Sequence, residues 1–129
     1  MKKYFVLVAA ALFLMSAGKK DSDGVITKEY GMSVVNTTTI CKSIEGYNGP
    51  VPLKIYIKKN KVEKIELLKN TETPKYLAMV KKSLMEAWNG LSVKEATTKK
   101  VDGVTGATFT SDALIQNVQK GLEYYQKNK

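Results

Sequence analysis

Histidine and arginine are absent from this sequence of 129 residues, and cysteine occurs once. Without histidine, the chain lacks the commonest general base and the commonest metal ligand, so histidine-based hydrolase triads and most zinc sites are excluded. All 21 basic residues are lysines, and they are spread along the whole chain. Because nucleic-acid readers usually rely on the paired donors of arginine, we expect no nucleic-acid partner.

The single cysteine, Cys41, has no second cysteine with which to form an internal disulfide. It lies in a run of β-branched residues, which indicates a buried thiol in a strand. The formal net charge of +9 is most simply explained by lysines that are solvated at the surface. The alternative is that the charge attracts an anionic ligand, a membrane surface or an acidic partner. The length and the hydrophobic fraction of 43% predict one domain with its own core.

The first residues have the pattern of an export signal. Lys2 and Lys3 precede an apolar run over residues 4–15, and the small residues 16–18 follow it. A helix that spans a bilayer needs about 20 apolar residues, so an uncleaved anchor is the weaker alternative. Lys19 stands where a lipoprotein signal has its cysteine, so lipid anchoring is not supported. We therefore expect a signal peptide over residues 1–18 and a protein in the periplasm or on the outer face of the cytoplasmic membrane.

The first half of the remaining chain has the pattern of a β-sheet. Residues 25–44 are rich in β-branched side chains and predict one or two strands, and the glycines and prolines of residues 45–52 predict a loop. Apolar residues alternate along residues 51–58, which predicts a strand, and Lys59-Asn60 predicts a tight turn into a return strand. On that return strand, the alternation places Glu63, Ile65 and Leu67 on one face.

The second half has the pattern of two helices. The first begins after Thr73 as cap, with Pro74 at the first helical position, and it ends at Asn89-Gly90. Its apolar stripe, which we expect in the core, consists of Leu77, Val80, Leu84 and Trp88, with Met85 beside it. Residues 92–100 read as a polar connection, residues 101–104 as a short strand, and the last helix runs from Ser111 onward.

These elements predict the fold class α+β, as a small single domain in which an antiparallel sheet with a central hairpin is covered by two helices. The expected organisation is a signal peptide over residues 1–18, an N-terminal lead-in with one or two strands over residues 19–43, and the main domain over residues 44–129.

The stretch "VDGVTGATFTSDAL", residues 101–114, leads into the last helix and is rich in hydroxyl groups and glycine. The first N–H groups of a helix have no partner within the helix, and glycine allows a ligand to approach, so this entrance suits a phosphate. A purely structural interpretation is also open, in which Thr110 or Ser111 caps the helix and Gly106 makes a turn. The stretch is neither a Walker A loop nor the G-x-G-x-x-G fingerprint.

The order of residues in this stretch resembles the flavinylation motif of the FMN-binding domain family. That family includes the subunits that carry covalent FMN in the sodium-pumping NADH:quinone oxidoreductase and in the Rnf complex. The motif is Asp, two residues, Ser or Thr, and Gly-Ala-Thr, usually followed by another Ser or Thr. The matching residues here are Asp102, Thr105, Gly106, Ala107, Thr108, Thr110 and Ser111.

The resemblance continues upstream and covers about residues 44–125. The glycine-rich loop of the family is matched by Gly46, Tyr47, Gly49 and Pro50. A later Glu-Thr element, which precedes a helix, is matched by residues 72–74.

The resemblance implies that Thr108 carries FMN through a phosphoester bond to its side-chain oxygen. A separate, magnesium-dependent flavin transferase would make this bond from FAD and recognise the motif. Asp102 suits a role in fixing the turn or in recognition by the transferase, because a carboxylate is a poor direct ligand for phosphate. Thr105 is open between motif recognition and turn structure.

Other residues have two interpretations each. Glu72 and Thr73 either cap the following helix and supply charge to its first turn, or contact the flavin, as the resemblance implies. Tyr47 and Pro50 either wall the flavin or pack on their own hairpin. Gly49 belongs to the same flavin-side loop.

Three functions follow from these observations. The leading one is an exported electron-transfer module with covalent FMN, which exchanges electrons with donor and acceptor proteins, membrane-bound ones included. The alternative is an exported binding module that holds FMN or another phosphate-bearing ligand non-covalently. A flavin reductase with its own substrate is the third, and it has little support because the chain has neither histidine nor suggestively spaced paired carboxylates. Because the chain has little beyond the minimal domain, membership of a sodium-pumping complex is not expected.

Overall fold

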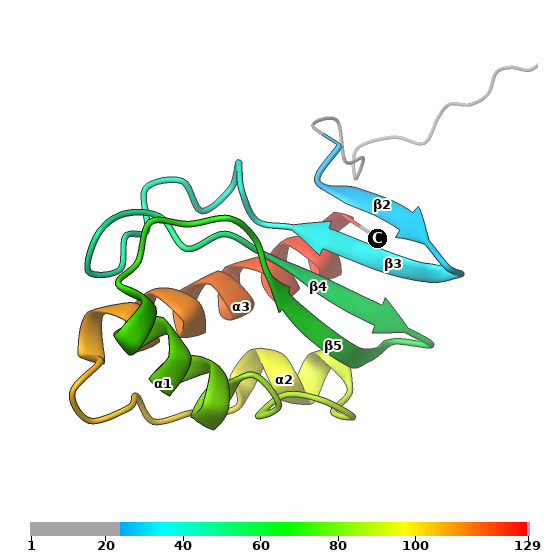
Figure 1. Cartoon of the computed structure of the whole chain (residues 1–129). Coiled ribbons are helices and arrows are strands. Elements are labelled where there is room, and N and C mark those ends of the chain that lie inside the picture. Colours follow the sequence, from blue (N-terminus) through cyan, green and yellow to red (C-terminus); the bar gives the residue numbers. More distant parts are fainter. Residues whose placement is uncertain (1–23, 129) are drawn as a thin grey trace, which may run out of the picture.

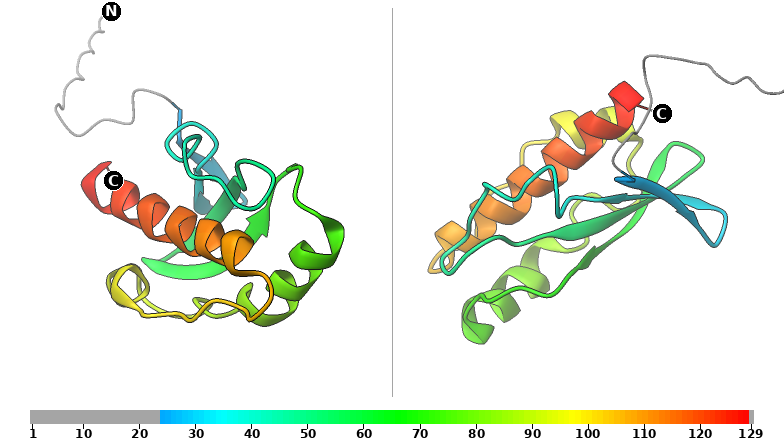
Figure 2. Two further views of the ribbon diagram at one scale, coloured as in Figure 1. Left: turned by 90° about the vertical axis from the view of Figure 1, so that its left-hand side faces the viewer. Right: turned by 90° about the horizontal axis from the view of Figure 1, so that it is seen from above.

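The computed structural model describes residues 24–128, so the expected signal peptide lies outside the described residues. The chain forms a four-stranded antiparallel sheet in the order β2-β3-β4-β5, and the helices lie on one side of it (Figures 1 and 2). The strands are β2 (Ile26–Glu29), β3 (Met32–Asn36), β4 (Leu53–Lys58) and β5 (Lys61–Leu67), and the helices are α1 (Pro74–Leu84), α2 (Val93–Thr98) and α3 (Thr108–Asn128). The α+β prediction is confirmed, with three helices in the described residues where two were expected. The expected hairpin, β4–β5, lies at one edge of the sheet and is not central, because β4 is the only described strand that pairs with β5.

Both hairpins close through two-residue turns in which each residue has a positive φ. In the turn between β4 and β5, Lys59 and Asn60 have φ angles of 51° and 64°, as the expected tight turn requires. Tyr30 and Gly31, between β2 and β3, have φ angles of 54° and 77°. Such turns match the twist of the strands, so each of them fixes the register of its hairpin.

A β-bulge changes which residues of β5 point inward. Ile57 pairs with Val62, whereas Tyr56 pairs with Lys64, so Glu63 is an extra residue without a partner on β4. As a result Val62 and Ile65 are both buried, and Glu63 is exposed. The expectation that Glu63 shares the inward face of Ile65 is therefore wrong, because strict alternation does not hold across a bulge.

The core lies between the sheet and the helices. Its largest fully buried side chain is Trp88, and Ile55, Leu114 and Leu122 are buried beside it in the same cluster. Trp88 was expected in the core, and this is confirmed. The first helix, however, ends at Leu84 and not at Asn89-Gly90, because residues 85–90 form a series of turns.

Helix α3 approaches the sheet closely at Gly121. A Cβ atom at this position would lie 2.6 Å from Ile55 Cδ1 and 3.0 Å from Thr37 Cγ2, so only glycine fits without a shift of its neighbours. The Thr37 hydroxyl donates a hydrogen bond of 2.6 Å to Asn117 Oδ1 on the same helix, and both residues are buried. This polar contact fixes the position of α3 along the sheet, because its donor and acceptor are both removed from water.

Cys41 is buried, as expected, but it lies in a turn and not in a strand. Its N–H donates to the carbonyl of Thr37, because the chain leaves the sheet after β3 and coils over residues 38–43. Burial raises the pKa of the thiol, while the positive charge of Lys120 opposes this shift.

Residues 92–100 are not merely a polar connection, because they contain α2. The Ser92 hydroxyl accepts a hydrogen bond from the Glu95 N–H, and the Glu95 carboxylate accepts one from the Ser92 N–H, which is a capping box. Residues 101–104 form no strand, because they run along the helical side of the molecule, away from the edges of the sheet (Figure 1). They lead directly to the start of α3.

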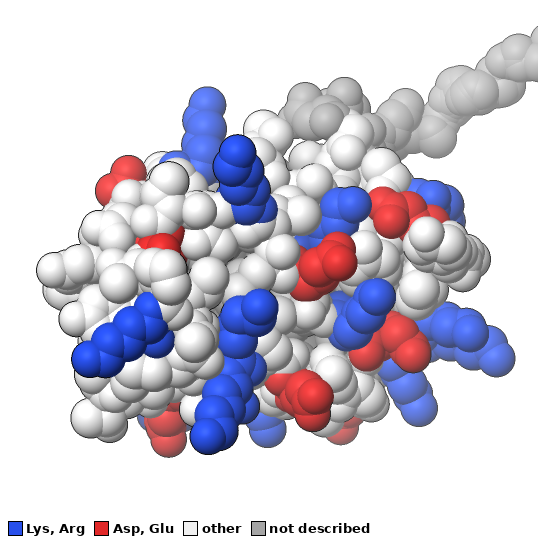
Figure 3. Space-filling model, viewed as in Figure 1, with Lys and Arg blue, Asp and Glu red and all other residues white. Residues whose placement is uncertain are grey.

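The surface in Figure 3 carries lysines dispersed among acidic side chains. Within residues 24–128, none of the helices is both long and apolar enough to cross a membrane.

Candidate functional site

The site begins with a tight turn before α3. The Ala107 N–H donates a hydrogen bond of 2.9 Å to the carbonyl of Val104, which closes a four-residue turn. Gly106, at the third position of this turn, has a φ of 89°, which is the value that a type II turn requires there. The expected turn at Gly106 is therefore present. It brings the chain from the extended segment directly into the helix.

Helix α3 begins at Thr108, three residues earlier than the expected start at Ser111. The Ser111 N–H already donates to the carbonyl of Ala107, which is the first bond of the helix. Thr110 and Ser111 therefore lie inside the first turn, and the expectation that one of them caps the helix is wrong. The residue in the cap position is Ala107, whose side chain has no acceptor. In the described part of the chain, the N–H groups of residues 108–110 donate to no protein oxygen.

The four hydroxyl groups of the stretch fall into two classes. Thr110 and Ser111 are 1% and 0% exposed, and both are engaged within the fold. The Ser111 hydroxyl accepts the Val104 N–H at 2.9 Å, and the Thr110 hydroxyl donates to Glu72. Thr105 and Thr108 are exposed, and their hydroxyls make no hydrogen bond among residues 24–128. Of these four residues, only Thr105 and Thr108 are therefore accessible to a second protein.

Glu72 connects three segments that are distant in sequence. Its buried carboxylate accepts hydrogen bonds from the N–H groups of Tyr47 at 2.8 Å and Asn48 at 2.6 Å, and from the Thr110 hydroxyl at 2.5 Å. A Cβ atom at Gly46 would overlap Glu72 Oε1, so any larger residue there would displace this carboxylate. Glu72 thus holds the glycine-rich loop over residues 46–49 against the start of α3.

Thr73 occupies the cap position of α1, but its side chain makes no capping hydrogen bond. Its hydroxyl instead accepts a hydrogen bond of 2.9 Å from the side-chain amide of Asn48. The Thr71 hydroxyl donates to the carbonyl of the same Asn48 at 3.0 Å. Thr73 thus stands at the cap position before Pro74, as expected, but without a capping bond, and no acidic residue lies in the first turn of α1, so the first-turn charge expected of Glu72 is absent. Their polar groups bind the neighbouring loop.

Gly49 and Pro50 complete this loop. The carbonyl of Gly49 accepts the Gly46 N–H at 2.7 Å, and Pro50 pairs with Glu45 in an isolated bridge. Gly49 has a φ of 145°, and a Cβ atom there would lie 3.1 Å from the Thr71 hydroxyl. The loop is consequently closed on itself and on the Glu72 segment.

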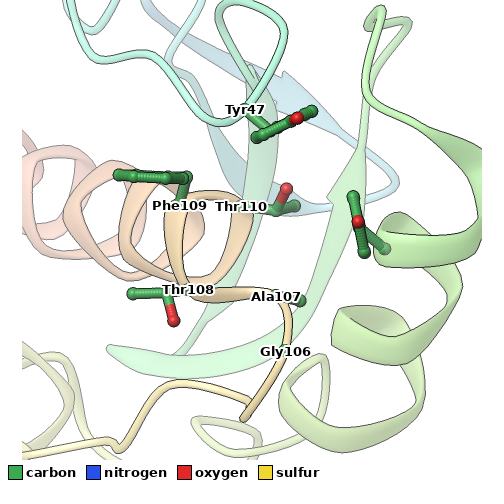
Figure 4. Close-up of a pocket in the computed structure, with 7 residues that line it drawn as sticks. Tyr47, Gly106, Ala107, Thr108, Phe109 and Thr110 are labelled. Atoms are coloured by element: carbon green, nitrogen blue, oxygen red, sulfur yellow. The ribbon is translucent and has the colours of Figure 1, made fainter.

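A pocket of about 240 Å³ lies where the loop, α1 and the start of α3 meet. It is lined by Tyr47, Tyr76 and residues 106–110, none of which carries a charge. Figure 4 shows Tyr47 facing the first turn of α3, from which Thr108 and Phe109 project on different sides. The lining of the pocket therefore includes aromatic side chains together with the first residues of α3, among them Thr108.

The structure brings most of the predicted site residues together and leaves one apart. The segments that contain residues 105–111, 72–73 and 46–49 are joined by the hydrogen bonds described above. Asp102 is exposed, and its carboxylate makes no hydrogen bond or ion pair within residues 24–128, so the turn forms without it. Sequence reasoning missed Tyr76 and Phe109 as pocket residues, because aromatic side chains on helices also suit a core.

Comparison with known proteins agrees with this geometry. A search of curated proteins found no match to the chain. The sequence model of the FMN-binding domain matches residues 46–123, which contain the loop, the Glu72 segment and α3 up to Glu123. The protein is accordingly an FMN-binding module, a flavoprotein, and the chain belongs to the FMN-binding domain family.

Proposed function

We propose that FMN is attached covalently to Thr108, by a phosphoester bond to its side-chain oxygen, and that the protein is an exported electron-transfer module. The observation that carries this proposal is that Thr108 is the one hydroxyl-bearing residue of the stretch that is both exposed and part of the pocket lining. Thr110 and Ser111 are unsuitable carriers, because both hydroxyls are buried and already hydrogen-bonded. Thr105 is exposed, but it does not line the pocket.

The residues at the start of α3 fit the phosphate of FMN. The open N–H groups of residues 108–110 and the positive end of the helix dipole favour an anion at this position. Gly106 and Ala107 carry little side-chain bulk, so the backbone is accessible to a phosphate and to a modifying enzyme. The uncharged aromatic lining of the pocket suits the apolar ring system of a flavin.

The attachment step is assigned to a separate flavin transferase that uses FAD and magnesium. The Thr108 oxygen forms a bond to the phosphorus of the FMN half, the bond within the pyrophosphate of FAD breaks, AMP leaves, and the hydroxyl proton is released to the transferase. In this chain Thr108 supplies the oxygen, and the turn at Gly106 presents it. Asp102 is exposed and makes no contact that fixes the turn, which supports a role in recognition by the transferase.

A bound flavin accepts one or two electrons, so it links donors and acceptors of both kinds. The residues around the pocket hold the cofactor at the surface, where donor and acceptor proteins have access. The N-terminal apolar segment supports export, and membrane-bound redox proteins outside the cytoplasm are the partners that we propose.

The test is the intact mass of the full chain after co-expression with a flavin transferase. We expect wild type to gain one FMN, Thr108→Ala to gain none, and Thr105→Ala, the matched exposed hydroxyl, to gain one. An unchanged wild-type mass would contradict covalent attachment. An FMN adduct on Thr108→Ala would show that another residue carries the flavin. If the yellow colour leaves the protein on denaturation, the protein holds FMN non-covalently. The free N–H groups at the start of α3 would also suit this alternative.

A further inference from the structure

The turns of the two hairpins lie at the same end of the sheet. Ser33, two residues after the turn at Tyr30-Gly31, pairs with Ile57, two residues before the turn at Lys59-Asn60. Figure 1 shows both turns at one end of the molecule and the start of α3 at the other. We call this end of the sheet, with residues 30–31 and 58–61, the hairpin end.

Tyr30 occupies a position in its turn that disfavours a bulky side chain. Its φ of 54° lies in the left-handed region, which glycine and asparagine adopt readily and tyrosine does not. The residue is 91% exposed, so packing against the fold does not compensate for this strain. An exposed aromatic residue in a strained backbone conformation is typical of a site of contact with a partner.

The second turn carries a cluster of positive charge. Lys58, Lys59 and Lys61 are exposed, and within residues 24–128 none of their ammonium groups forms an ion pair. A pocket of about 350 Å³ is lined by these three lysines, Val62, Glu63 and Gly90. Glu63 is the one acid in this lining, so the charge of the lining is positive. Figure 3 shows lysine side chains that project outward at this end of the molecule.

We propose that the hairpin end docks on a membrane surface that contains anionic phospholipid. The ammonium groups of the three lysines contact the lipid phosphates, which attract juxtamembrane lysines. Tyr30 has an apolar ring and a polar hydroxyl, so its side chain lies among the lipid headgroups. This inference does not depend on the flavin, because the pocket at the start of α3 is at the opposite end and remains in the water (Figure 1).

The composition and shape of the hairpin end favour a lipid surface over an acidic protein. Lysine is depleted at protein interfaces, where arginine is enriched, and this chain contains no arginine. Both turns project from the same end of the sheet, so a flat surface can contact them at the same time (Figure 1). The N-terminal apolar segment, which supports export, also brings the chain to a membrane.

The test is co-sedimentation of the full chain with vesicles, at low and at high salt. One set of vesicles contains phosphatidylglycerol and phosphatidylcholine, and the other contains phosphatidylcholine alone. The first variant replaces the three lysines of the hairpin end by glutamine. The second is Tyr30→Asn, in which the new residue suits the left-handed turn and should not weaken the fold. The matched control removes the same charge from exposed positions of α1, as Lys75→Gln/Lys81→Gln/Lys82→Gln.

We expect wild type to bind the anionic vesicles at low salt and to dissociate from them at high salt. The variant without the three lysines of the hairpin end should bind roughly 10-fold more weakly. Tyr30→Asn should bind several-fold more weakly, because the interfacial ring is lost. The α1 variant should remain within about twofold of wild type, because its lysines lie on a helix away from the hairpin end.

Three results would overturn the proposal. Equal losses in the two lysine variants would show a general effect of net charge and no docking at the hairpin end. Equal binding of all variants to neutral vesicles at high salt would show that the N-terminal apolar segment alone holds the chain on the lipid. Absence of binding to anionic vesicles at low salt would exclude the lipid as the partner of this surface.

Discussion

Replacement of Glu72 by alanine removes the acceptor that joins the glycine-rich loop to the start of α3. The carboxylate is 5% exposed and accepts hydrogen bonds from Tyr47, Asn48 and Thr110. The loop and the helix are far apart in sequence, so no local interaction replaces this connection. We expect the variant to lose stability and to lose the alignment of Tyr47 with the helix.

The magnitude follows from what each donor does after the substitution. Tyr47 and Asn48 belong to an exposed loop, so water can replace the carboxylate at a cost of roughly 0.5–1 kcal/mol for each N–H group. The Thr110 hydroxyl is 1% exposed, and leaving it unpaired costs about 1–3 kcal/mol. The total is about 3 kcal/mol, a large part of the 5–15 kcal/mol that is typical of a domain. Glu72→Gln retains an acceptor oxygen and should cost about 1–2 kcal/mol.

The assay is urea unfolding followed by the fluorescence of Trp88, the single and fully buried tryptophan. Glu45→Gln, an exposed acid on the same loop, is the matched control and should change stability by less than about 0.5 kcal/mol. In a double-mutant cycle, Glu72→Ala and Thr110→Val should be non-additive by about 1 kcal/mol or more. A loss below about 1 kcal/mol for Glu72→Ala, or strict additivity, would refute the reasoning.

Three further predictions concern the fold and the turn. Gly121→Ala should lower the free energy of unfolding by about 1–3 kcal/mol, measured by thermal unfolding, because the added Cβ would lie 2.6 Å from Ile55 Cδ1. This loss is expected although alanine has the higher helix propensity. Burial of Tyr56 and the hydrogen bond that its O–H donates to Glu66 raise the pKa of Tyr56 to about 12. The free energy of unfolding should therefore fall as pH rises from about 10 to about 12, and Tyr56→Phe should remove that fall. Gly106→Ala should lose about 1–3 kcal/mol by strain at a φ of 89°, and co-expression followed by intact mass should detect less flavinylation.

The sequence was sufficient to predict the β4–β5 hairpin, but not its place at the edge of the sheet. Alternation along residues 51–58 and the Asn60 turn are local signals, and the strand, over residues 53–58, and the turn are both confirmed. The bulge at Glu63 could not be predicted, since it depends on the pairing of β5 with β4. The pair Ser92 and Glu95 has the spacing of a capping box, which indicates the start of a helix. Helix α2 was nevertheless missed, because so short a helix shows little apolar periodicity.

Most residues of the candidate site could be predicted from the sequence, but their contacts and burial could not. The ordered motif identified Thr108 because spacing along one chain carries that information. The sequence does not reveal that Thr110 and Ser111 are buried, because α3 starts earlier than their hydroxyl groups suggested. The role of Glu72 as a shared acceptor depends on contacts with residues 24, 25 and 38 positions away, which only the folded chain defines.

The central claim is that one hydroxyl group, that of Thr108, carries FMN. Cleavage after Lys100 and Lys120 releases residues 101–120 as a single peptide that contains all four candidate hydroxyls. Fragmentation of this peptide from protein co-expressed with a flavin transferase assigns the modified residue directly. The account predicts that fragments containing Thr108 carry the flavin phosphate and that fragments limited to residues 101–107 or 109–120 do not. A flavin on Thr105, Thr110 or Ser111, or a peptide without flavin, would contradict it.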